Sequence, residues 1–99
     1  MPDDHTLRAL ALALPGTSEQ PHHGFPSFRT ARRIYATLPD SAHAHLMLDP
    51  AAIGEAVAAF PGACSEKWWG KQLAAVRIEL AAIPLAALAA LLAEAHGRP

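Results

Sequence analysis

The stretch Leu14–Leu38, LPGTSEQPHHGFPSFRTARRIYATL, decides the fold because the hydrophobic period of the chain changes within it. Leu7, Leu10 and Leu14 recur at helical spacing, and Pro15-Gly16 then ends the helix. From residue 27 onward, apolar and polar residues alternate, which is typical of a β-strand with one buried face. The stretch therefore predicts a helix over residues 4–14, capped by Asp3 or Asp4, followed by an antiparallel meander.

The alternation assigns faces to the expected strands. Strands are expected at residues 28–30, 33–38, 43–48 and 74–80. In the second of them, strict alternation directs Ile34, Ala36 and Leu38 toward the core and Arg33, Tyr35 and Thr37 toward the other face. Because Arg77 has the same outward parity on the last strand, the open sheet face is expected to form one continuous surface.

The remaining signals complete an α+β architecture. Asp49-Pro50 starts a second helix, Pro61-Gly62 stops it, and Pro84 opens a third. Residues 63–70 are interpreted as a loop. The order α-β-β-β-α-β-α predicts a two-layer sandwich, an antiparallel sheet with helices on one face, in a single domain spanning residues 1–99. The expected core is Leu10, Leu14, Phe28, Ile34, Leu46, Leu48, Ile53, Val57, Phe60, Val76, Ile78, Leu88 and Leu92.

These residues resemble a known family. The pattern Leu14-Pro15-Gly16-Thr17, Glu19, Gly24, Pro26 and Phe28, followed by Arg33–Leu38, is similar to the MmcQ/YjbR family. The downstream order, a helix from Asp49-Pro50, Pro61-Gly62, a Trp-bearing loop, a strand and a C-terminal leucine helix, extends the resemblance over nearly the whole chain. The resemblance implies a fold related to the bacterial frataxin type, described as a double wing, and a DNA-binding role. Ala31-Arg32-Arg33 stands where the family often has Gly-Lys or Gly-Arg at the hairpin tip. The iron role of frataxins is not implied, because the first helix has only two acidic residues, Asp3 and Asp4.

Charge and cysteine content exclude several classes of protein. The net charge of the 99 residues is -1, whereas a domain that grips DNA mainly through phosphates is usually basic. Cys64 is the only cysteine, so no internal disulfide forms and a reducing, cytoplasmic location is expected. The longest apolar run, Leu85–Ala93, is shorter than the roughly 20 residues that span a bilayer, so no membrane partner is expected.

Two groups of cationic and aromatic residues are candidates for nucleic-acid contact. Arg29, Arg32 and Arg33 cluster at the first hairpin, where they would contact phosphates or, alternatively, keep a sheet edge from pairing with other chains. Trp68 and Trp69 stand between two lysines, an arrangement that can stack on single-stranded bases or fill an alanine-rich core. The full candidate set is Arg29, Arg32, Arg33, Tyr35, Lys67, Trp68, Trp69, Lys71 and Arg77.

No metal, cofactor or catalytic residue is expected. His43 and His45 share one strand face and His22-His23 lie earlier, but no further ligands follow at metal-binding spacing. Cys64 lies near Lys67 and is interpreted as an inert thiol, because reactivity needs a specific environment. The chain has no phosphate-binding loop, nucleophile elbow or HExxH.

The sequence therefore predicts a small non-enzymatic binding module. The resemblance favours binding to DNA, and the small number of cationic residues that can reach phosphates at once predicts that this binding is weak. The near-zero charge favours the alternative, a protein-interaction or small-ligand module with no nucleic-acid role.

Overall fold

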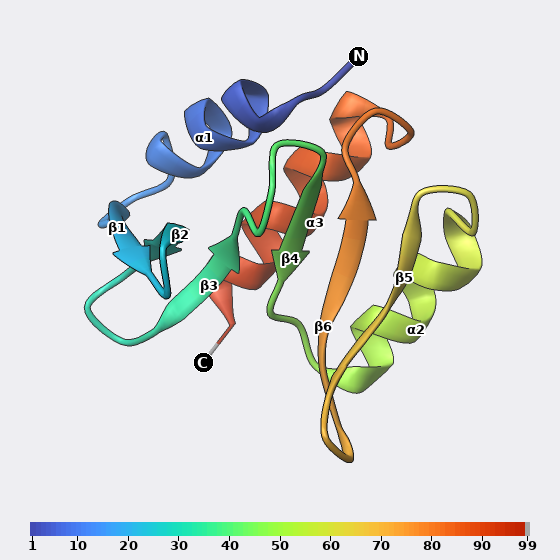
Figure 1. Ribbon diagram of the computed structural model, residues 1–99. Helices are drawn as coiled ribbons and strands as arrows, with labels where there is room; N and C mark the ends of the chain where they lie inside the picture. The colour runs from blue at the N-terminus through green and yellow to red at the C-terminus, as the bar shows by residue number, and fades with distance from the viewer. Residues whose placement is uncertain (99) are drawn as a thin grey trace.

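A computed structural model describes residues 1–98 as a six-stranded antiparallel sheet with three helices on one face (Figure 1). The predicted α+β sandwich is confirmed, with the order α-β-β-β-β-α-β-β-α. The helices are α1 (Asp4–Leu12), α2 (Pro50–Ala59) and α3 (Leu85–Gly97). The strands are β1 (Ser18–His22), β2 (Phe25–Arg29), β3 (Ile34–Thr37), β4 (His43–Leu46), β5 (Cys64–Trp69) and β6 (Gln72–Glu79). Within residues 1–98, no helix is long and apolar enough to cross a bilayer.

Two of these strands correct the expected order. β1 was not predicted, and β5 occupies the segment that was interpreted as a loop. The sheet order β1-β2-β3-β4-β6-β5 places both at the edges, where only one neighbour pairs with them. Edge strands do not need a buried face, so β1 is exposed over most of its length and lacks the apolar alternation that identifies a strand.

Two-residue turns join each edge strand to its neighbour. His22 opposes Phe25 across the turn His23-Gly24, in which both residues have positive φ, 52° and 85°, as in a type I′ turn. Trp69 opposes Gln72 across a turn that begins with Gly70 at φ 60°, as in type II′. Turns of these types match the twist of paired strands, so Gly24 and Gly70 are the residues in the sequence that indicate the two hairpins.

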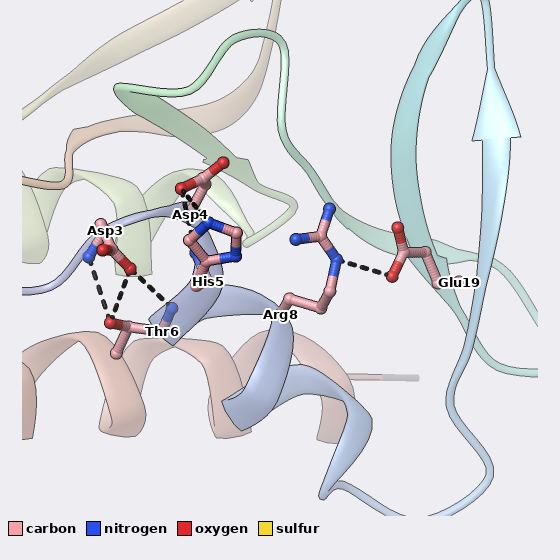
Figure 2. A network of polar contacts seen from close by, with 6 residues as sticks. All are labelled: Asp3, Asp4, His5, Thr6, Arg8 and Glu19. Atoms are coloured by element: carbon pink, nitrogen blue, oxygen red, sulfur yellow. Dashed lines mark hydrogen bonds and ion pairs between the residues drawn. The ribbon is translucent and has the colours of Figure 1, made fainter.

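Polar contacts fix the first helix at its start and against the sheet (Figure 2). The Asp3 carboxylate accepts a hydrogen bond from the backbone N–H of Thr6 at 2.9 Å, and the Thr6 hydroxyl accepts one from the backbone N–H of Asp3. Asp3 is therefore the cap of α1, one of the two predicted candidates. Arg8 donates to Glu19 at 2.9 Å, an exposed ion pair that joins α1 to β1.

The core lies between the helices and one row of strand residues. In register across four strands, Phe28, Ala36, Leu46 and Val76 oppose one another, and all four are fully buried. Of the predicted core, these members are buried: Phe28, Leu46, Leu48, Ile53, Val76, Ile78, Leu88 and Leu92. Four others, Leu10, Leu14, Val57 and Phe60, pack at its margin. The buried set also includes residues outside that list: Leu7, Tyr35, Leu38, Leu80 and Ile83.

A β-bulge at Tyr35 interrupts the alternation of β3. Phe28 opposes Ala36 while the next residue of β2, Arg29, opposes Ile34, so Tyr35 is the extra residue. The bulge puts Tyr35 on the same side as Ala36, facing the helices, and leaves Ile34 on the open face with Thr37. The predicted outward position of Tyr35 and the predicted core position of Ile34 are therefore wrong, because a one-residue shift moves side chains to the other face.

Tyr35 links the sheet to both neighbouring helices. Its hydroxyl donates to the carbonyl of Ala11 in α1 at 3.2 Å and contacts the Thr17 hydroxyl at 2.8 Å. Its ring packs edge-on against His96 in α3, with ring centroids 5.3 Å apart. Burial raises the pKa of Tyr35, partly offset by the bond to Thr17, so the phenol stays protonated at neutral pH and able to donate.

Replacing Tyr35 with Phe tests the bulge. We expect Tyr35→Phe to lower the free energy of unfolding by about 1–2 kcal/mol, because the substitution removes the hydroxyl's hydrogen bonds to the Ala11 carbonyl and the Thr17 hydroxyl. The Ala11 carbonyl keeps the Leu14 N–H as a donor. Urea denaturation measures the change. Thr17→Val is the paired control: if the two hydroxyls bond to each other, the double variant loses less than the sum of the two single losses. An unchanged stability in Tyr35→Phe would place the hydroxyl in water and refute the bulge.

Candidate functional site

A row of polar residues crosses the sheet on the face that the helices leave open. Antiparallel register places the row in the order Gln20, Ser27, Thr37, His45, Arg77, Ser65. Although no helix within residues 1–98 covers this face, Ser27 is 0% exposed, Thr37 4% and His45 8%. The open face is therefore concave, with these side chains at its floor.

The floor contains a neutral histidine paired with an arginine. Nη1 of Arg77 lies 2.9 Å from Nε2 of His45. A guanidinium has only donors, so Nε2 must accept. Burial, reinforced by the charge of Arg77, lowers the pKa of His45 to about 4. The imidazole is therefore neutral at pH 7 and carries its one proton on Nδ1.

Above the floor lies an open groove of about 730 Å³. One wall comes from the β1–β2 turn, where the rings of His22 and Phe25 pack edge to face with centroids 6.0 Å apart. The other comes from Lys67 and Trp69, which lie two residues apart and so on one face of β5. The complete lining is His22, His23, Phe25, Ile34, Thr37, Pro39, His45, Met47, Lys67 and Trp69.

The three arginines predicted at the hairpin do not form one cluster. Nη2 of Arg29 donates to the Ser27 hydroxyl at 2.7 Å, so this side chain lies along its own strand. Nη2 of Arg33 donates to the carbonyls of Ala95, at 3.3 Å, and Arg98 at the end of α3, where a positive charge complements the helix dipole. Of the three, Arg32 alone is exposed at the turn. The expected continuous surface of Arg33, Tyr35 and Arg77 does not exist, because the bulge directs the first two to the helices.

The tryptophans lie on opposite faces of β5 and neither fills the core. Trp68 is 49% exposed and Trp69 is 55% exposed. Trp68 donates from its indole N–H to Glu66 at 3.2 Å, on the face away from the groove, while Trp69 lines the groove. The alternative in which a tryptophan closes the core is therefore wrong. Lys71 is exposed in the β5–β6 turn.

The histidines and the cysteine have separate surroundings. His43 contacts the Asp40 carboxylate through Nδ1 at 3.0 Å, whereas His45 bonds to Arg77. Among residues 1–98, no three His, Cys, Asp or Glu side chains gather as a metal site would require. Cys64 is buried, and burial raises the pKa of its thiol, so the thiolate is disfavoured there.

The apolar alternation of the sequence could predict only some of the residues that line the groove, for a physical reason. Alternation correctly directed Thr37 and Arg77 outward, and it placed His43 and His45 on one face. It could not show that Ile34 joins them, because the bulge has no signature in the alternation itself. Phe25 and Met47 lie at strand ends, where parity says little about burial. His23 also lines the groove, and its positive φ is indicated only by the Gly that follows it.

A comparison with known proteins supports the fold. A scan against protein-family models and a search of the curated proteins find no match to this chain. Among solved structures, the crystal structure of Deinococcus radiodurans protein DR2400, a DUF419 domain, is similar with a TM-score of 0.78. The two sequences are 23% identical, and the match covers 96% of this chain and 76% of DR2400. The chain therefore has the fold of a DUF419 domain, which resembles the MmcQ/YjbR type.

The pairing of His45 with Arg77 predicts an acid-sensitive stability. Between pH 6.5 and 4, the unfolded chain binds a proton at His45 that the folded protein does not, so stability falls as the pH falls through this window. Arg77, Lys67 and His43 oppose that proton and Asp40 favours it. Urea denaturation at pH 7.0, 5.5 and 4.5 measures the effect.

His45→Gln is the comparison, because an amide oxygen still accepts from Arg77 but does not titrate in this range. We expect the wild type to lose more stability than His45→Gln on going from pH 7.0 to 4.5. Parallel pH profiles for the two proteins would show that His45 is not desolvated in the folded state.

Proposed function

We propose that this protein is a non-enzymatic binding module whose concave sheet face takes a small amphipathic molecule. The groove above the polar row is the observation that carries the proposal. Its volume of about 730 Å³ lies within the range of small-molecule sites, roughly 300–1,000 Å³. Its lining combines apolar walls with a few polar groups, which is the usual composition of such sites.

The surroundings of the reactive side chains support a binding role over a catalytic one. The lone pair of His45 Nε2, which a general base would use, already accepts from Arg77. The Cys64 thiol is buried and its raised pKa disfavours the nucleophilic thiolate. Both side chains are thus engaged or shielded, while the apolar walls of the groove remain accessible.

A neutral fluorescent probe tests this proposal without depending on charge. We expect N-phenyl-1-naphthylamine to bind saturably at one site per chain, with a rise in its emission as it leaves water. Met47→Trp should weaken this binding at least about tenfold, because the larger side chain occupies the volume that the probe needs.

Leu12→Trp is the matched control, since Leu12 is exposed at the end of α1 and outside the groove lining. It should bind the probe as the wild type does. Probe binding that is absent, or equal in Met47→Trp and Leu12→Trp, would contradict a groove-binding function.

Nucleic acid is the second candidate, and one observation favours it. Arg32, Lys67 and Lys71 make no side-chain hydrogen bond or ion pair within residues 1–98, and Trp69 presents an exposed ring beside Lys67. Cationic residues next to an accessible aromatic ring are typical of single-strand binding surfaces. The other candidate arginines are engaged inside the protein, so few phosphate contacts remain for DNA.

A salt titration with single- and double-stranded DNA tests this candidate. With about three phosphate contacts, duplex affinity should fall by about 1.5 decades between 50 and 200 mM salt. The triple variant Arg32→Ala, Lys67→Ala, Lys71→Ala should remove most of that slope and remain folded, because these side chains have no hydrogen-bond or ion-pair partner in the described part of the chain. A wild type that does not bind DNA even at 50 mM salt would exclude the nucleic-acid role.

A further inference from the structure

We infer that the groove is selective for a planar aromatic monocarboxylate, with Lys67 as the counter-charge and the Nδ1–H of His45 as the directional donor. This inference rests on the proposed function, because it names the ligand class of the same groove. It is argued from the charge of the lining, the tautomer of His45 and the position of the aromatic rings.

The charge of the lining favours an anion. Among the groove residues within the described chain, Lys67 is the one that is permanently charged, and none carries a carboxylate. An unpaired ammonium beside apolar walls is complemented by one negative charge. A carboxylate supplies that charge, whereas a phosphate monoester carries about −1.5 to −2 at pH 7 and would be undercompensated.

The floor adds a hydrogen-bond donor with a fixed direction. Because Arg77 occupies Nε2, the ring of His45 is held with its proton on Nδ1, which has no protein partner among residues 1–98. Lys67 lies on β5, two strands from His45 with β6 between them, and both side chains line the groove. The Lys67 charge helps to lower the pKa of His45, which supports their proximity. A carboxylate accepts several hydrogen bonds and can therefore receive one from each group.

The walls favour a flat apolar body. Trp69 follows Lys67 by two residues on the same face, so its ring lies next to the ammonium along the groove wall. Phe25 and His22 provide rings at the opposite end, and Ile34 and Met47 lie between them. Aromatic rings gain additional stabilisation by packing on other rings in offset or edge-to-face geometry.

Two ligands of nearly equal shape, one anionic and one neutral, separate the effect of ligand charge on affinity from the effect of ligand size. At pH 7, we expect 2-naphthoate to bind at least about tenfold more tightly than neutral 2-naphthamide, measured by isothermal titration calorimetry. The difference corresponds to a hydrogen bond with a charged partner in a partly desolvated site. Decanoate, which has the same charge on a flexible chain, should bind more weakly than 2-naphthoate.

The variant Lys67→Met tests whether the preference for 2-naphthoate over 2-naphthamide depends on the Lys67 side chain. Methionine retains most of the apolar stem but has no charge, so this variant should bind 2-naphthoate at least about fivefold more weakly and 2-naphthamide unchanged. Lys71→Met is the matched control, because Lys71 is exposed in the adjacent turn and outside the lining. It should bind both compounds as the wild type does.

The outcomes distinguish this inference from the function on which it rests. Equal binding of 2-naphthoate and 2-naphthamide, an equal loss of 2-naphthoate binding in both lysine variants, or tighter binding of decanoate would overturn it. In each of those cases, saturable binding of N-phenyl-1-naphthylamine would leave the groove-binding proposal intact. Failure of that neutral probe to bind would instead contradict the proposed function itself.

Discussion

The extra residue in β3 is the constraint on which both faces of the sheet depend. At the bulge, Tyr35 and Ala36 of β3 both lie opposite Phe28 of β2. Tyr35 therefore points into the helix layer, where its hydroxyl contacts α1 and its ring contacts α3. The same displacement returns Ile34 to the open face beside Thr37. The packing of Tyr35 on the helices and the place of Ile34 in the groove lining are therefore two consequences of one irregularity in the ladder.

Much of the fold could be predicted from the sequence, and the misses have physical causes. The three helices were identified because capping residues such as Asp49-Pro50 satisfy backbone groups that are otherwise unpaired. The central strands alternate because one of their faces is buried. The edge strands β1 and β5 were not predicted, because their side chains are mostly exposed and burial therefore imposes no apolar alternation on them. The candidate site was predicted in part. Of the residues proposed for it, Arg77 and Lys67 lie on the open face, whereas Arg33 and Tyr35 point toward the helices.

The distribution of positive charge limits what the protein can bind. Arg8, Arg29, Arg33 and Arg77 each donate to a group within the protein, to a carboxylate, a hydroxyl, helix carbonyls and an imidazole respectively. Counting arginines along the sequence therefore overstates the surface available to phosphates. Within residues 1–98, the groove lining holds one lysine and the neutral imidazole of His45, which suits one small anion better than a polyanion.

The most direct test of this account is a chemical-shift map of the backbone amides during titration with 2-naphthoate. The account predicts that the largest shifts fall on the open face, at Thr37, His45, Met47 and Lys67, with Leu88 of α3 unaffected. Shifts concentrated on the helices or on the β2–β3 turn around Arg32 would contradict it, because they would place binding away from the groove on the open face.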